Sequence, residues 1–113
     1  MNRFTTLISL LFLSIGIQAQ SFKPSEVVTF KKIERKDDLV LNFFYPSEHK
    51  KNDGQKRPAV VFFFGGGWSG GSPKQFFPFA DHLAKKGMVA ISAQYRTKKS
   101  HGVIPAECVK DGN

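Results

Sequence analysis

Hydrophobic and polar positions alternate near the start of the chain. Residues 27–33 place apolar Val28 and Phe30 between polar neighbours, and residues 39–45 form a second extended segment after a charged turn. A repeat of two residues is typical of half-buried β-strands. We therefore expect two strands that pair as a hairpin.

A different pattern begins after Pro58. Residues 59–64 are an unbroken apolar run bounded by Pro58 and Gly65, and the preceding residues 46–57 are polar and rich in lysine. Continuous apolar runs are typical of parallel strands that helices cover on both faces. The run therefore predicts a central parallel strand, which an exposed connection precedes.

A helical pattern follows the glycine-rich residues 65–71. Ser72 and Pro73 have the residue types of an N-cap and a first helical position. Apolar residues then recur at helical spacing, namely Phe76, Phe77, Ala80, Leu83 and Ala84. Gly87 predicts the end of this helix, and residues 88–94 predict a further strand.

The order of these elements defines the fold class. Two extended segments precede a strand, glycine loop, helix and strand. We expect an α/β fold with a mixed, mostly parallel sheet whose first strands are antiparallel. Residues 104–113 contain a proline followed by apolar Ala106 and Val109, which predicts the beginning of another helix.

The first twenty residues have the pattern of a secretory signal peptide. Arg3 supplies a positive charge, and residues 7–17 are an apolar stretch too short to cross a bilayer. The small Ala19 fits a signal-peptidase site, so we expect cleavage after Ala19 or Gln20. The interpretation is a secreted or periplasmic product with no stable membrane insertion after cleavage, in which residues 21–113 belong to one domain.

The charge of the chain does not indicate a nucleic-acid partner. Seventeen basic and nine acidic residues give a net charge of +8, but no stripe of basic residues is interleaved with stacking aromatic residues. We expect these basic side chains in solvated loops and at strand edges. His49, His82, His101 and Cys108 have no metal-ligand spacing, so we expect no metal and no cofactor, with the histidines at the surface.

The glycine-rich segment carries the chemical signal. In Phe64-Gly65-Gly66-Gly67-Trp68, consecutive glycines follow a buried strand, so no Cβ covers their backbone N–H groups and these can face a ligand oxygen. This segment resembles the His-Gly-Gly-Gly-Trp loop of α/β-hydrolase carboxylesterases, a group that includes hormone-sensitive-lipase-like and feruloyl-esterase-like enzymes.

The resemblance extends along the chain. Residues 90–96, which end in Tyr95-Arg96, resemble the fourth strand of these esterases. Residues 105–111 are similar to the start of their next helix, whose aspartate matches Asp111. The resemblance implies the N-terminal part of an α/β-hydrolase fold, made of its first four strands and first helix.

The resemblance also implies a function. In that family the first two glycines of the loop donate N–H groups to an oxyanion, which implies catalytic roles for Gly65 and Gly66. Gly67 would complete the turn, and Trp68 would pack the loop or line the substrate pocket. The family's usual histidine is Phe64 here, so a side-chain hydrogen bond that shapes the loop in many relatives cannot form. The expected substrate is an acetyl or feruloyl ester, either a small molecule or one borne on a polysaccharide.

The catalytic triad is not expected within this chain. In the α/β-hydrolase fold the serine, acid and histidine all follow the fourth strand. The family's fourth strand also lies between the second and third, which leaves residues 60–64 at an open sheet edge. Open apolar edges aggregate, so we expect the 113-residue chain, ending at Asn113, to be inactive and poorly stable alone.

Two other motifs overlap the same loop. The sequence around Ser69 formally matches the nucleophile motif G-x-S-x-G, but Ser69 lies in mid-loop before a separate helix cap, so we expect a solvated hydroxyl. Gly65, Gly67 and Gly70 fit the dinucleotide fingerprint G-x-G-x-x-G. A Rossmann-like unit is therefore an alternative, although the next strand ends without its acidic residue. A second alternative is a non-catalytic binding module that presents the loop.

Overall fold

A computed structural model describes residues 20–113 of the protein. Its elements are β1 (Glu26–Lys31), β2 (Leu39–Phe44), β3 (Ala59–Phe63), the short 3-10 helix η1 (Pro73–Phe76), α1 (Phe77–Lys85), β4 (Val89–Ala93), α2 (Lys98–His101) and α3 (Pro105–Lys110). The expected signal peptide and its cleavage after Ala19 lie outside the described residues. Between residues 20 and 113, none of the helices has the length and apolar character needed to cross a membrane.

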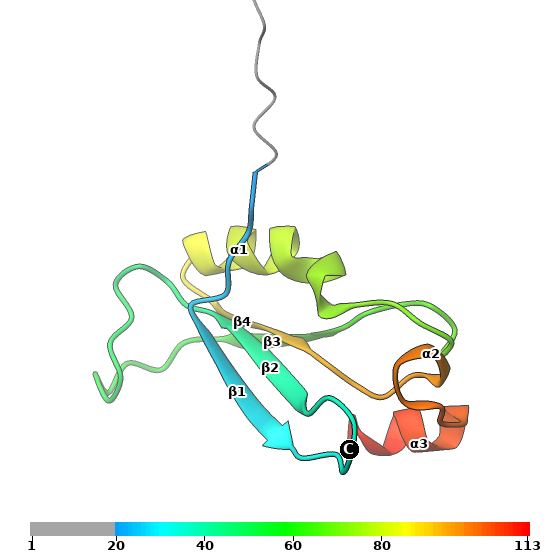
Figure 1. Ribbon diagram of the computed structural model, residues 1–113. Coiled ribbons are helices and arrows are strands. Elements are labelled where there is room, and N and C mark those ends of the chain that lie inside the picture. Colours follow the sequence, from blue (N-terminus) through cyan, green and yellow to red (C-terminus); the bar gives the residue numbers. More distant parts are fainter. Residues whose placement is uncertain (1–19) are drawn as a thin grey trace, which may run out of the picture.

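The four strands form one mixed sheet in the order β1-β2-β4-β3. β2 pairs antiparallel with both β1 and β4, whereas β3 and β4 are parallel. A parallel pair needs a long crossover, and α1 supplies it between β3 and β4. Figure 1 shows α1 above the sheet. The predicted α/β fold with antiparallel first strands is therefore confirmed.

The predicted helix after Ser72 is divided in two. Ser72 Oγ accepts a hydrogen bond from the Lys74 amide at 3.3 Å, as expected of an N-cap. The first turn is the 3-10 helix η1, and α1 begins only at Phe77. Because Pro78 has no N–H, it cannot donate the bond that would continue one α-helix through this point.

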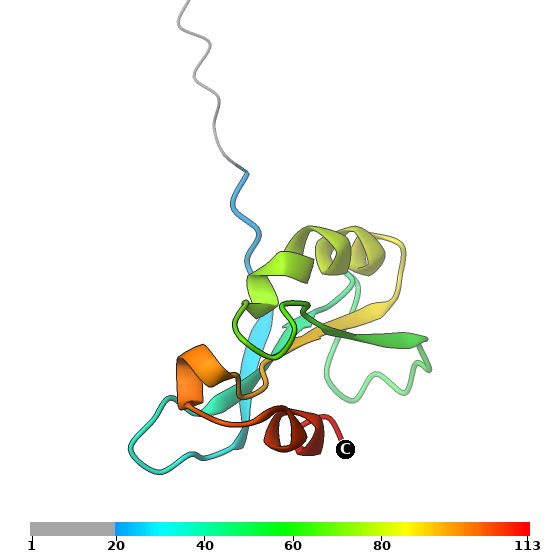
Figure 2. The same ribbon diagram turned by 90° about the vertical axis from the view of Figure 1, so that its right-hand side faces the viewer.

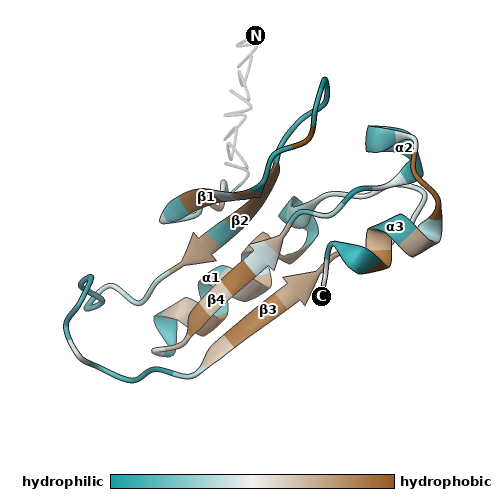
Figure 3. Ribbon diagram, turned by 90° about the horizontal axis from the view of Figure 1, so that it is seen from below, coloured by the Kyte–Doolittle hydropathy of each residue, from teal (hydrophilic) through white to brown (hydrophobic). Residues whose placement is uncertain are grey.

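β3 is an edge strand of the sheet formed by residues 20–113, which confirms the predicted open edge at residues 60–64. The central, doubly covered position that the apolar run alone predicts is not found among these residues. Successive side chains of a strand point to opposite faces. Val60 and Phe62 pack toward the core beneath α1, whereas Val61 and Phe63 are each 47% exposed. Figure 3 views the open face, where apolar colouring covers much of β3 and β4.

Two apolar clusters stabilise the fold, one beneath α1 and one at the ends of β3 and β4. The cluster beneath α1 contains Phe44, Phe77, Ala80, Ala84 and Ala90. The other joins Phe64, Tyr95 and Cys108, and it lies where β3 and β4 end. Figure 2 shows α1 on one side of the sheet and α3 on the other. The second cluster thus lies beneath the glycine loop and supports it.

Candidate active site

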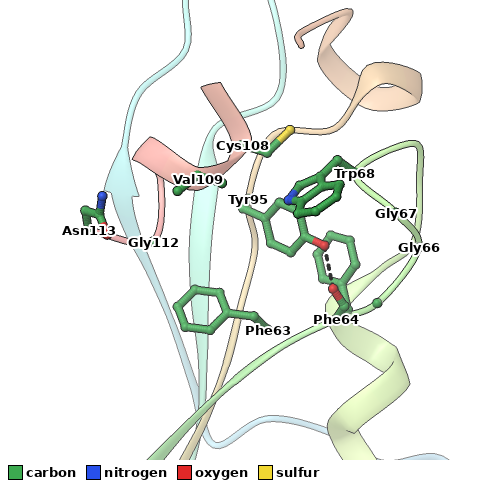
Figure 4. A pocket seen from close by; sticks show the side chains of 11 residues that line it. Phe63, Phe64, Gly66, Gly67, Trp68, Tyr95, Cys108, Val109, Gly112 and Asn113 are labelled. Atoms are coloured by element: carbon green, nitrogen blue, oxygen red, sulfur yellow. Dashed lines mark hydrogen bonds between the residues drawn. The ribbon is translucent and has the colours of Figure 1, made fainter. Parts of the chain in front are cut away.

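The glycine loop, residues 65–71, leaves the carboxyl end of β3 and leads into η1. Ligands of open α/β sheets bind outside the carboxyl ends of the strands. A cleft of about 370 Å³ lies at this end, and Gly65, Gly66, Gly67 and Trp68 line it together with residues of β3, α3 and the end of β4. Figure 4 shows Trp68, Tyr95 and Cys108 gathered at this cleft.

A tight turn forms the tip of the loop. The Ser69 amide donates to the Gly66 carbonyl at 3.1 Å, and the two central residues, Gly67 and Trp68, have φ angles of 58° and 61°. A type I′ turn needs positive φ at both central residues, a conformation that glycine adopts freely and tryptophan rarely. Trp68, in this strained conformation, is 47% exposed and lines the cleft.

The amides of the loop differ in what they bind. The Gly65 amide donates to Gln75 Oε1 at 2.8 Å, and the Ser69 amide is used in the turn. Within residues 20–113, the amides of Gly66, Gly67 and Trp68 make no hydrogen bond. Of the two glycines predicted to bind an oxyanion, Gly65 therefore has an amide that is already occupied, and Gly66 has one that is open.

Close packing requires glycine at two places in the loop. A Cβ on Gly66 would lie 2.1 Å from the Gly70 carbonyl oxygen, and one on Gly71 would lie 2.6 Å from the Phe64 ring. Such distances are far below van der Waals contact, so any larger residue would displace the backbone. A Cβ on Gly65 would have no neighbour nearer than 4.0 Å. The loop is thus folded tightly onto itself beyond Gly65.

Phe64 supports the loop where the resembling esterases have histidine. Its ring is 2% exposed and stacks on the ring of Tyr95, with centroids 4.1 Å apart and planes 13° apart. The Tyr95 hydroxyl donates to the Phe64 carbonyl. Burial raises the pKa of Tyr95, and the nearby Cys108 adds to this effect, so the hydroxyl keeps its proton. An aromatic pair therefore replaces the missing histidine hydrogen bond.

The short helix α2 holds the other side of the turn. The Lys98 amide donates to the Trp68 carbonyl at 3.0 Å, and the Lys99 amide donates to the Ser69 carbonyl at 2.9 Å. Thr97 and Ser100 cap the helix through reciprocal side-chain bonds. α2 was not predicted from the sequence, although a hydroxyl residue three positions before another polar residue is a recognisable capping signal.

A buried ion cluster fixes the end of β4. The Asp111 carboxylate is 0% exposed, and it accepts from Arg96 Nε at 2.8 Å and from Lys31 Nζ at 2.7 Å. Burial raises the pKa of Asp111, but the hydrogen bonds from Arg96 and Lys31 outweigh it and lower that pKa to about 2. The cluster ties α3 to β4 and β1. The sequence did not predict Arg96 and Lys31 as its partners; Lys31 lies on the edge strand β1 with 39% of its side chain exposed.

Ser69 and the three histidines do not form a catalytic pair. Ser69 is exposed, and among the described residues no histidine ring is hydrogen-bonded to it. His82 is exposed, His49 stacks on Tyr45, and His101 binds a backbone carbonyl of the β1–β2 connection at 2.8 Å. In the part of the chain between residues 20 and 113, no three histidine, cysteine or acidic side chains group as metal ligands do.

The strand order, the α1 crossover and the glycine loop at the end of β3 define the N-terminal part of an α/β-hydrolase sheet. The model of the carboxylesterase family matches residues 14–98. The chain therefore belongs to the carboxylesterase family. Because this match includes the whole glycine loop, it contradicts the alternative of a dinucleotide-binding unit.

Solved esterases resemble the chain in sequence and in fold. A thermophilic esterase from the planctomycete Thermogutta terrifontis, Est2 with propionate bound, is 46% identical with a TM-score of 0.69, and the match covers 76% of this chain and 30% of that one. Esterase 2 of the same organism phosphorylated by paraoxon is 44% identical with a TM-score of 0.71, covering 80% and 34%. The chain spans about a third of the length of these esterases. Among curated proteins, no match was found.

Proposed function

We propose that these residues supply the oxyanion-binding loop of a secreted serine carboxylic-ester hydrolase. The observation that carries the proposal is a set of amides at the carboxyl end of β3 that make no hydrogen bond within residues 20–113, in glycines that line a cleft of about 370 Å³. Secretion follows from the signal pattern of the first twenty residues. The nucleophilic serine, its acid and its histidine base would come from residues that follow β4 in this fold.

We assign the oxyanion donors to Gly66 and Gly67, which shifts the predicted pair by one residue. The Gly65 amide already donates to Gln75, whereas those of Gly66 and Gly67 are open and lie on the cleft. When a serine oxygen attacks an ester carbonyl, the carbonyl oxygen becomes negatively charged. Two N–H groups held at that position stabilise the charge more in the transition state than in the substrate.

The lining of the cleft favours an ester substrate with a small acyl group. Its lining includes the rings of Phe63 and Trp68 and the side chains of Cys108 and Val109, and none of the lining side chains from residues 20–113 is charged. The T. terrifontis Est2 was solved with propionate and with butyrate bound. We therefore propose a neutral ester with a short acyl group, of which an acetyl ester is the simplest; a feruloyl ester is the larger alternative.

The test uses the product of the natural open reading frame that encodes these residues, hereafter the natural gene product. It should hydrolyse 4-nitrophenyl acetate and butyrate faster than the palmitate ester. Gly66→Ala keeps the N–H, but its Cβ would lie 2.1 Å from the Gly70 carbonyl oxygen and would displace this donor. The variant should therefore lower kcat by about 10²- to 10³-fold, as for the loss of one oxyanion donor. Gly54→Ala, in the exposed β2–β3 connection, is the matched control.

Either of two results would overturn the proposal. One is a natural gene product that hydrolyses none of these esters, which would favour a binding module. The other is a Gly66→Ala variant whose kcat equals that of the Gly54→Ala control, because the loop would then not serve the chemistry.

A further inference from the structure

Gln75 is the only residue of the described chain whose side chain binds an amide of the Gly65–Gly67 run. Its Oε1 accepts from the Gly65 amide at 2.8 Å across ten residues of sequence. Neither the sequence motif nor the family resemblance drew attention to this residue. The glycines themselves have no side chains with which to hold the loop, so an outside anchor has a strong influence on it.

The backbone that carries Gln75 is fixed on both sides. On one side, buried Ser92 of β4 donates from Oγ to the Pro73 carbonyl at 2.7 Å. On the other, the ring of Phe76 stacks on that of Phe62 in β3, with centroids 4.9 Å apart and planes 10° apart. Gln75 therefore projects from a turn that is attached to both parallel strands.

The bond between Gly65 and Gln75 determines which amides remain open. It directs the first glycine amide toward η1, and the chain then reverses through Gly66 (φ 146°) and Gly67 (φ 58°). These conformations are the ones in which glycine has most freedom. The Tyr95 hydroxyl holds the carbonyl of the Phe64–Gly65 peptide group, and Gln75 holds its N–H, so without Gln75 only the carbonyl end of this group is fixed before the next two amides.

We propose that Gln75 is a positioning residue that holds the Gly66 and Gly67 amides in the orientation that binds an oxyanion. This inference rests on the proposed function of the loop. Gln75 itself contacts neither the substrate nor the reacting atoms. It acts through the Gly65 amide, and its role requires a hydrogen-bond acceptor at the end of the side chain.

Steady-state kinetics of the natural gene product can test this role. Gln75→Met keeps the length of the side chain and removes the acceptor, so kcat should fall about 10- to 100-fold, in line with small misplacements of catalytic groups, while KM changes less than about twofold. Gln75→Glu keeps an acceptor oxygen and should recover most of that loss. Lys74→Met, on the same turn and with an exposed side chain, should leave kcat unchanged.

Hydrogen exchange provides a readout that does not depend on activity. Gln75→Met should speed exchange in a peptide that spans residues 62–72, and Lys74→Met should not. The inference is overturned if Gln75→Met retains kcat within twofold, or if Gln75→Glu and Gln75→Met lose kcat equally. Gly66→Ala reports on the loop itself. A large loss of kcat in Gly66→Ala with no loss in Gln75→Met would therefore reject the positioning role of Gln75 and leave the proposed function of the loop unaffected.

Discussion

The ring of Phe64 lies against the ring of Tyr95, and the Tyr95 hydroxyl donates to the carbonyl of the same Phe64. Phe64 directly follows β3, and Tyr95 lies two residues after β4. The pair therefore joins the ends of the two parallel strands at the base of the glycine loop. The loop depends on this pairing for its position.

Removal of the Tyr95 hydroxyl should destabilise the protein. Tyr95→Phe keeps the stacked ring but leaves the buried Phe64 carbonyl without its donor, which should cost about 1–3 kcal/mol. Tyr45→Phe is the control, because the Tyr45 hydroxyl binds the Glu26 carboxylate, whose side chain is 29% exposed, so water can replace the lost bond and the cost should be smaller. Urea unfolding of the natural gene product measures both. Equal shifts of the two midpoints would count against the importance of the pair.

Two neighbouring glycines should respond differently to alanine. Gly65→Ala adds a Cβ into space that is open to 4.0 Å, whereas the Cβ of Gly66→Ala would lie 2.1 Å from the Gly70 carbonyl oxygen. We expect Gly65→Ala to retain the thermal midpoint within about 2 °C and Gly66→Ala to lower it by several degrees, since about 1 kcal/mol shifts Tm by a few degrees. Crystal structures of both variants would show whether only the second displaces the loop. A displaced loop in Gly65→Ala would contradict the packing described above.

Protonation of the Asp111 carboxylate should lower the stability of the folded protein in acid. Its folded pKa of about 2 lies below the ordinary value of 3.8, so its contribution is complete above pH of roughly 4 and is lost as the pH falls through 2. This difference corresponds to about 2 kcal/mol. Unfolding free energies at pH 5 and pH 2 should therefore differ less in Asp111→Asn than in the wild type, by about that amount.

Asp37→Asn provides the control for this pH dependence. Its side chain is exposed and makes no hydrogen bond among the described residues. The variant should keep the wild-type loss of stability between pH 5 and pH 2. If Asp111→Asn also keeps that loss in full, the buried ion cluster does not have the energetic role assigned to it.

The open face of β3 should cause self-association when residues 20–113 are expressed alone. Val61 and Phe63 are each 47% exposed on an edge strand, and apolar edges pair with other chains. Val61→Lys should shift the sedimentation profile toward monomer. Phe79→Lys is the control, because Phe79 is 59% exposed on a helix without free strand hydrogen-bonding groups. A fully monomeric wild-type chain would contradict this prediction.

The individual strands followed closely from local sequence patterns, whereas the position of β4 between β2 and β3 followed from the resemblance to the esterase family. Alternation identified β1, the apolar segment after the charged turn identified β2, and the run before Gly65 identified β3. Ser72-Pro73 marked the start of the helical segment. These signals are local, so the sequence reveals them directly. The apolar run 59–64 alone predicts a central strand, whereas the expected strand order places residues 60–64 at an open edge, and the described chain has the edge strand. Apolarity alone does not tell which neighbours are present to cover a strand.

The details of the site depend on contacts between distant residues. Gln75 is an ordinary polar residue in the sequence, and only the fold brings its Oε1 to the Gly65 amide. In the same way, Asp111 meets Lys31 across eighty residues. The glycine motif thus located the loop, but it could not show which of its amides were already used.

The central claim is that the Gly66 and Gly67 amides bind the oxyanion. A crystal structure of the natural gene product with a phosphonate covalently attached to its serine would test it most directly, because the phosphonyl oxygen mimics the oxyanion. We predict that this oxygen lies about 2.7–3.1 Å from both amide nitrogens, with Gly65 still bound to Gln75. An oxygen bound by the Gly65 amide, or one held by other groups far from this loop, would contradict the account.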